Sequence, residues 1–343
     1  MIILIYMLSA AVVVIIFYLL TNTSDKKIDK KIKRTLGFQE VSYREKFLTG
    51  IDEGVIPLSE NLTVTSRYIE SKYTNEKMRY IVITPKILKD KKYPCVFFLH
   101  GIRDSADDWI SRGRLVENYE YSLESGKIKE MIMVIPDSGN QGESWYADFV
   151  KKEEKKYESY FIKELIPEIK ENYSISETGV AGFSMGGHGA FKLGLRNLKI
   201  FKVMGSFAGA ISLIRLSVNR RVMRIIKILY IPPFVFGSED KKQFLDVFGS
   251  FGYQIIKQDP YSLIKEISYK HPEELKDRYF YLSVGDEDRA PYLMLQQWID
   301  IVGRLKKYKA NFSGNLYRGE AHTWEYVSKD LPNLLKYFSD HLN

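Results

Sequence analysis

The segment around Ser184 constrains the fold of this chain more than any other. Residues 181–190 read Ala-Gly-Phe-Ser-Met-Gly-Gly-His-Gly-Ala, so a Gly-x-Ser-x-Gly pattern stands between a strand-like apolar run and a helix-like run. A strand that turns at once into a helix strains the backbone at the turn, and Gly182 and Gly186 remove the side chains that would clash there. The pattern makes Ser184 a candidate nucleophile. The alternative is a glycine-rich turn that contains a serine without a catalytic role, because such a turn can have the same sequence.

A serine nucleophile needs a base, and the chain has five histidines. His322 follows the strand-like run 311–317 and precedes a helical stretch, so a loop at the carboxyl edge of a sheet can present it to Ser184. The other four are less suited, because each lies in an upstream loop, one helical turn beyond the serine, before a proline, or near the chain end: His100, His188, His271 and His341. We therefore predict His322 as the base, against the alternative of a surface histidine.

A carboxylate is needed to orient the histidine and to stabilise its charged form. In chains with this type of serine turn the order is serine, acid, histidine, so the acid should follow a strand between Ser184 and His322. The run 279–284 is such a strand, and it leads into Gly-Asp-Glu-Asp-Arg at 285–289. We favour Asp288, with Asp286 assigned to the tight turn itself and Glu287 as the least suited of the three.

An oxyanion hole requires two backbone N–H donors. The residue after the serine, Met185, supplies one. The second is expected in the loop after an early central strand, here 93–99, where the N–H of Ile102 is the best candidate. Gly101 keeps that loop free of a side chain where a substrate must approach.

These stretches resemble the putative-esterase (esterase D-like) branch of the α/β-hydrolases, which includes feruloyl esterases, S-formylglutathione hydrolases and mycolyltransferases. The resemblance extends over most of residues 60–340, and its motifs are Leu99-His100-Gly101-Ile102, Asp107-Asp108-Trp109, Gly182 to Ala190, Gly285 to Asp288, and His322 with Trp324.

The resemblance implies an α/β-hydrolase fold with a mostly parallel central sheet flanked by helices. It gives the triad positions to Ser184, Asp288 and His322, and the oxyanion positions to Ile102 and Met185. It also implies substrate contacts by four residues, namely His100, Gly101, Trp109 and Trp145. A His-Gly-Ile loop stands where S-formylglutathione hydrolases carry a cysteine, so that activity is less favoured.

The apolar pattern agrees with this architecture. A helical run over 156–173 keeps its apolar residues on one face, and similar runs separate the later strands. Alternation of strands and helices implies a parallel sheet covered on both faces. The expected strands are 63–70, 79–84, 93–99, 131–135, 179–183, 202–207, 279–284 and 311–317.

Residues 1–20 contain no charged side chain and as a helix would span about 30 Å, the thickness of a bilayer core. We predict a single-pass membrane anchor, with a cleaved signal peptide as the alternative. Residues 21–46 hold eight basic and four acidic side chains and are interpreted as a basic tether, which leaves 47–343 as the catalytic domain. Positive charge after the span favours the cytoplasmic side, whereas several exported relatives favour the opposite side, so the side stays open with the cytoplasm slightly favoured.

A cap insert is expected at about 211–250. Its segment 218–229 forms an amphipathic helix on a helical projection, and residues 211–235 carry five basic and no acidic side chains. It is either a helix packed on the domain or a cap lying on anionic lipid. The net charge is +8, and the tether and this insert account for it, so the charge pattern does not indicate a nucleic-acid partner.

We predict a membrane-anchored serine hydrolase that cleaves carboxylic esters of small molecules, lipids or sugars through an acyl-enzyme. No cofactor or metal is expected, because neither a Cys-His cluster nor a phosphate-binding glycine loop occurs, and the single cysteine, Cys95, lies in an apolar run. Transfer of the acyl group to a sugar or lipid alcohol, as in mycolyltransferases, is the first alternative. An inactive hydrolase fold that serves as a binding protein is the second.

Overall fold

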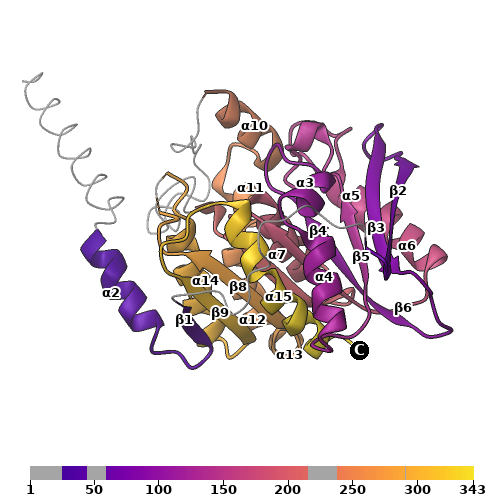
Figure 1. Ribbon diagram of the computed structural model, residues 1–343. Helices are drawn as coiled ribbons and strands as arrows, with labels where there is room; N and C mark the ends of the chain where they lie inside the picture. The colour runs from indigo at the N-terminus through magenta and orange to yellow at the C-terminus, as the bar shows by residue number, and fades with distance from the viewer. Residues whose placement is uncertain (1–24, 45–58, 215–237, 290) are drawn as a thin grey trace, which may run out of the picture.

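A nine-stranded sheet forms the centre of the computed structural model, which describes residues 25–44, 59–214, 238–289 and 291–343 (Figure 1). Its strand order is β1-β9-β8-β7-β6-β4-β5-β3-β2. The pairs β2–β3 and β3–β5 are antiparallel and the other neighbours are parallel. The strands are β1 Val41–Arg44, β2 Leu62–Glu70, β3 Lys77–Pro85, β4 Tyr93–Leu99, β5 Ile132–Pro136, β6 Ile175–Phe183, β7 Phe201–Phe207, β8 Tyr279–Gly285 and β9 Asn311–Tyr317.

Helices cover both faces of this sheet (Figure 1). The central strand β4 is therefore apolar along its whole length, with seven buried residues in a row. Neighbouring side chains on β4 point to opposite faces: the ring of Phe98 packs on Trp109, and the ring of Phe97 packs on Phe161. The helices are α2 Asp25–Thr35, α3 Ala106–Ser111, α4 Leu115–Glu124, α5 Tyr157–Tyr160, α6 Ile166–Asn172, α7 Met185–Arg196, α10 Ser238–Phe248, α11 Gly252–Ile256, α12 Pro260–Lys270, α13 Pro272–Lys276, α14 Met294–Lys307 and α15 Trp324–His341.

The predicted strands are confirmed, two of them, β4 and β9, with the expected bounds. The helix expected at 156–173 is also present, with a π-helical segment, Phe161–Leu165, between α5 and α6. The carboxyl ends of β4, β6, β8 and β9 lie at one edge of the sheet because these strands run parallel. The loops that carry the predicted site residues therefore share that edge.

The prediction of a polar tether over 21–46 is wrong for its described part, residues 25–44. Within it, α2 buries Ile28 against the domain, at 2% exposure, and places Lys31 3.8 Å from Asp300 of α14. The strand β1 extends the sheet by pairing with β9. The physical reason is that α2 keeps its apolar residues on one side while its charges face outward, so a high charge content did not prevent packing. The domain therefore begins before residue 47.

The predicted anchor at 1–20 lies outside the described residues, as does the basic segment 218–229. Within the residues that the structure describes, no helix is both long and apolar enough to cross a bilayer. The described part of the predicted insert, 211–214 and 238–250, contains α10, which packs through Phe244 and Phe248 on Trp145.

Ile28→Ala should lower the free energy of unfolding by about 2 kcal/mol, because it removes a buried side chain and leaves a cavity. Lys27→Ala, on the adjacent exposed position of α2, should change it by less than about 0.5 kcal/mol. Denaturant unfolding of both variants measures the difference. Equal values for the two variants would mean that α2 is the solvated tether that its composition indicates.

Candidate active site

Ser184 stands at a strained turn between β6 and α7. Its φ and ψ are 55° and −115°, outside the regions that most residues occupy. A Cβ on Gly182 would lie 2.3 Å from the backbone of Gly186, and a Cβ on Gly186 would lie 2.0 Å from the carbonyl oxygen of Leu99. Both glycines are thus required by close backbone contact, as the sequence predicted.

The structure brings the three predicted triad residues together. Ser184 Oγ lies 2.9 Å from His322 Nε2, and His322 Nδ1 lies 2.6 Å from Asp288 Oδ2. Because a carboxylate only accepts hydrogen bonds, the neutral imidazole carries its proton on Nδ1, and Nε2 is then free to accept the serine proton. Ser184 is 8% exposed and the Asp288 side chain is 7% exposed. The acid is thereby shielded from water while the histidine keeps access to solvent.

The acid turn after β8 separates Asp288 from its two neighbours. Asp286 accepts the N–H of Gly319 at 2.8 Å, which ties the acid turn to the loop that bears His322. Glu287 is exposed. A Cβ on Gly285 would lie 1.9 Å from the carbonyl oxygen of Glu320, so the two loops touch through their backbones. Asp286 therefore holds the loop and Asp288 holds the imidazole, which is the division of roles that the sequence favoured.

The two predicted oxyanion donors lie on adjacent segments. Met185 is the first residue of α7, where N–H groups have no partner within the helix. Ile102 follows the tight contact of the β4 end with Gly186, and a Cβ on Gly101 would lie 3.6 Å from the ring of Phe183. Among the described residues, neither N–H meets a protein acceptor. Both N–H groups therefore remain candidate donors to an oxygen at the serine.

The His322 ring packs on aromatic side chains. It lies on Phe183, with centroids 4.7 Å apart, and Phe183 in turn packs on Trp324. The indole N–H of Trp324 donates to Asp104 Oδ2 at 3.2 Å, and burial raises the pKa of that carboxyl. A Cβ on Gly101 would lie 2.5 Å from Asp104 Oδ2. Asp104 was not among the predicted site residues, and the only signal for it in the sequence is Gly101, the glycine that its carboxylate requires.

Two of the four residues expected to contact substrate do not reach a surface. His100 and Trp109 are each 0% exposed. His100 uses both ring nitrogens for contacts inside the protein, and Trp109 packs on Phe98 and on Trp324. This corrects the expectation that both side chains contact substrate. Other residues pack around them, so neither side chain reaches the surface.

The other two, Gly101 and Trp145, also lie inside the protein. Gly101 is buried in the loop after β4. Trp145 is 5% exposed and is covered by Phe244 and Phe248 of α10. The structure therefore places Trp145 between the insert and the domain.

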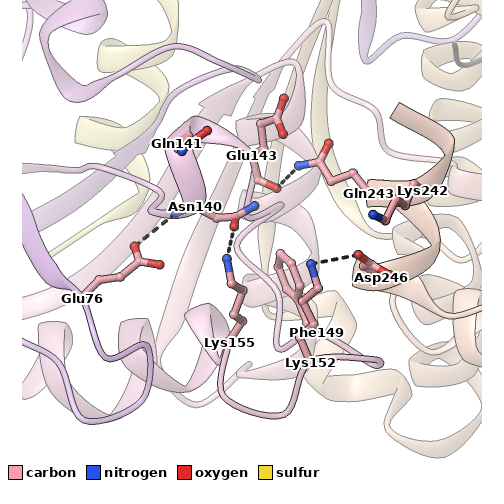
Figure 2. A pocket seen from close by; sticks show the side chains of 10 residues that line it. All are labelled: Glu76, Asn140, Gln141, Glu143, Phe149, Lys152, Lys155, Lys242, Gln243 and Asp246. Carbon is pink, nitrogen blue, oxygen red and sulfur yellow. Dashed lines mark hydrogen bonds and ion pairs between the residues drawn. The ribbon is translucent and has the colours of Figure 1, made fainter. Parts of the chain in front are cut away.

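A cavity of about 610 Å³ is lined by side chains of the segment 140–155 and of α10, together with Glu76 (Figure 2). Gly142, which stands between the lining residues Gln141 and Glu143, accepts the N–H of Arg103 at 2.9 Å through its carbonyl oxygen. Ser184 is not among the lining residues. Three lysines and three carboxylates balance its charge: Lys152, Lys155, Lys242, Glu76, Glu143 and Asp246. These carboxylates do not form a metal site, since the described part of the chain contains no group of three His, Cys, Asp or Glu side chains able to hold one.

Residues 71–336 match the family model described as "Putative esterase". The chain is 27% identical over 125 residues to an endo-1,4-beta-xylanase/feruloyl esterase of Xylanibacter ruminicola, a match that covers 35% of this chain and 17% of that protein. It is 26% identical over 152 residues to an S-formylglutathione hydrolase of Bos taurus, covering 38% of this chain and 51% of that protein. The chain thus spans about half or less of the length of these curated relatives.

A solved structure of a ferulic acid esterase is similar over almost its whole length. The TM-score is 0.65 at 24% identity, and the match covers 82% of this chain and 98% of that one. Together with the mostly parallel sheet, this likeness confirms the predicted α/β-hydrolase fold.

Asp288→Asn should lower kcat for a p-nitrophenyl ester by about 10⁴-fold, because the amide no longer holds the histidine in the required tautomer. Asp286→Asn should lower the midpoint of thermal unfolding and change kcat little. The reason is that it weakens the hydrogen bond that Asp286 accepts from the N–H of Gly319. Steady-state kinetics and thermal unfolding of both variants provide the comparison. The assignment of the acid is wrong if Asp286→Asn is the inactive variant.

Proposed function

The chain belongs to the "Putative esterase" family of α/β-hydrolases, and from this premise we propose that it is a membrane-anchored serine hydrolase that cleaves carboxylic esters through an acyl-enzyme. The observation that carries the proposal is the continuous hydrogen-bonded series from Asp288 through His322 to Ser184. A side-chain arrangement of this kind activates an otherwise weak hydroxyl nucleophile.

In the proposed reaction, Ser184 Oγ attacks the ester carbonyl carbon while His322 Nε2 takes the hydroxyl proton. Asp288 stabilises the imidazolium, and the N–H groups of Met185 and Ile102 stabilise the oxyanion. The C–O bond to the alcohol then breaks, and His322 returns the proton to the departing alcohol. Water, deprotonated by His322, attacks the acyl-enzyme, which releases the acid and restores the Ser184 hydroxyl.

Acyl transfer differs only in the second half of this reaction, where an alcohol replaces water. The same triad serves both reactions, so an acceptor experiment separates them: esters are turned over with and without glycerol or trehalose, and the products are separated by mass spectrometry. Free acid as the main product supports hydrolysis. The third possibility, a binding protein without activity, disagrees with the intact bonding between Ser184, His322 and Asp288.

Membrane attachment is proposed from the uncharged residues 1–20. The positive charges that follow favour the cytoplasmic side, although Lys31 is engaged with Asp300 and is therefore less available to a lipid surface. The segment 218–229 is proposed as a second contact with anionic lipid, on the basis of its charged and apolar faces.

Ser184→Ala should abolish both turnover of a short p-nitrophenyl ester and covalent labelling by a fluorophosphonate, because both depend on the same nucleophile. Gel fluorescence after labelling and an unfolding curve for the variant measure activity and folding separately. A folded variant that still becomes labelled would contradict the assignment of Ser184.

Deletion of residues 1–20 should move the protein from the membrane to the soluble fraction, with kcat/KM for a water-soluble ester unchanged. The deletion ends before α2, so the packing of Ile28 is retained. Fractionation of expressing cells and kinetics of the soluble protein test this. Continued sedimentation with membranes would show that residues 1–20 are not the anchor.

A further inference from the structure

His100 makes two hydrogen bonds that define its protonation. The backbone N–H of Ser138 lies 2.9 Å from Nε2 and can only donate, so Nε2 must be the unprotonated acceptor. A neutral ring then carries its proton on Nδ1, which donates to the carbonyl oxygen of Gly101 at 2.8 Å. In a protonated ring, Nε2–H and the Ser138 N–H would be two donors facing each other, and neither would have an acceptor there.

The surroundings keep this ring neutral. Burial lowers the pKa of His100, and the nearby carboxylates of Asp104, Asp108 and Asp137 oppose that effect only in part. The His100 ring packs against Tyr146, with centroids 5.9 Å apart, and the Tyr146 hydroxyl donates to the His100 carbonyl at 3.3 Å. His100 is thus fixed in both protonation and position.

The bond to Gly101 has a consequence on the other side of the same peptide group. In a planar trans peptide the C=O of one residue and the N–H of the next point in opposite directions. The Gly101 carbonyl accepts His100 Nδ1–H and, more weakly, the N–H of Asp104 at 3.4 Å. The N–H of Ile102 must therefore point away from both donors.

We propose that His100 is a positioning residue: its Nδ1–H holds the Gly101–Ile102 peptide so that the Ile102 N–H faces the oxygen that becomes negatively charged at Ser184. The inference rests on the proposed function, because it concerns how the oxyanion donor of that reaction is oriented. His100 itself touches neither substrate nor the reacting atoms. Its contribution is to prevent rotation of a glycine-containing peptide that has no side chain to restrict it.

Two substitutions separate the two ring nitrogens. In His100→Asn the side-chain amide nitrogen lies at the position of Nδ1 and still donates to Gly101, while the acceptor for Ser138 is lost. In His100→Gln the amide oxygen reaches the position of Nε2 and accepts from Ser138, while the donor to Gly101 is lost. Both variants remove the imidazole ring and so lose its contact with the Tyr146 ring.

We expect His100→Gln to lower kcat for p-nitrophenyl acetate by about 10- to 100-fold, part of the roughly 10²- to 10³-fold that removal of an oxyanion donor costs. KM should stay within about twofold, because the bond strengthens in the transition state and adds little to ground-state binding. His100→Asn should keep kcat within about threefold of the wild type. Thermal unfolding should show similar midpoints for both variants.

A folded His100→Gln protein with wild-type kcat would overturn the proposal, as would an equal loss of kcat in both variants. ¹⁵N NMR of histidine-labelled protein gives a test independent of turnover, and His100→Asn assigns the signal. The proposal requires a protonated Nδ1 and an unprotonated Nε2, in the wild type and in Ser184→Ala alike; a protonated Nε2 would contradict it. Turnover that persists in Ser184→Ala would instead refute the proposed function. The NMR result alone would then decide whether His100 holds the Gly101–Ile102 peptide.

Discussion

The close contact of three backbones at Ser184 is the constraint on which the site depends. Gly182 and Gly186 touch across the turn, and Gly186 touches the carbonyls of Leu99 and His100. Three further bonds fix the serine: its N–H donates to Phe207, and its carbonyl accepts from His188 and Ala210. Backbone strain at one residue is thereby balanced by contacts from three strands, which is how strained conformations persist at functional sites. The same contacts place the loop after β4 beside the start of α7.

A buried lysine extends this arrangement to the next loop. Lys192 on α7 is fully buried, donates to the carbonyl of Tyr146 at 2.6 Å and pairs with Glu158 at 3.2 Å. Burial lowers the pKa of Lys192, and the charge of Glu158 acts against that effect. A buried ion pair is weak evidence for stability. Here it holds a backbone in which Trp145 and Tyr146 both have positive φ, at 54° and 51°, and Tyr146 in turn bonds to His100.

The sequence predicted best what local patterns determine. The serine turn, the acid turn and the strands β4 and β9 follow from glycine spacing and apolar runs, and each was located correctly. It failed where tertiary packing outweighs composition. α2 was interpreted as a solvated tether because most of its side chains are charged, although its Ile28 is buried. The four-residue β1 is too short to show a period. His100 and Trp109 were predicted as substrate contacts because a motif gives the order of residues along the chain. It does not show which of their side chains are buried.

The same distinction explains why the chemistry is easier to derive than the substrate. The predicted triad residues and oxyanion donors lie on turns that short backbone contacts hold at the strand ends, and these contacts are visible in the sequence as glycines at fixed spacing. The predicted insert is joined to the segment that holds Trp145: its helix α10 packs Phe248 on Trp145 and on His188, and Gln243 donates to the carbonyl of Glu143. The segment from Gly142 to Tyr146 bonds to the loop after β4 through both Arg103 and His100. A change in the insert can therefore reach the loop after β4 without any substitution at Ser184, Asp288 or His322. The serine turn leaves little room for variation, because its backbones already touch at Gly182 and Gly186.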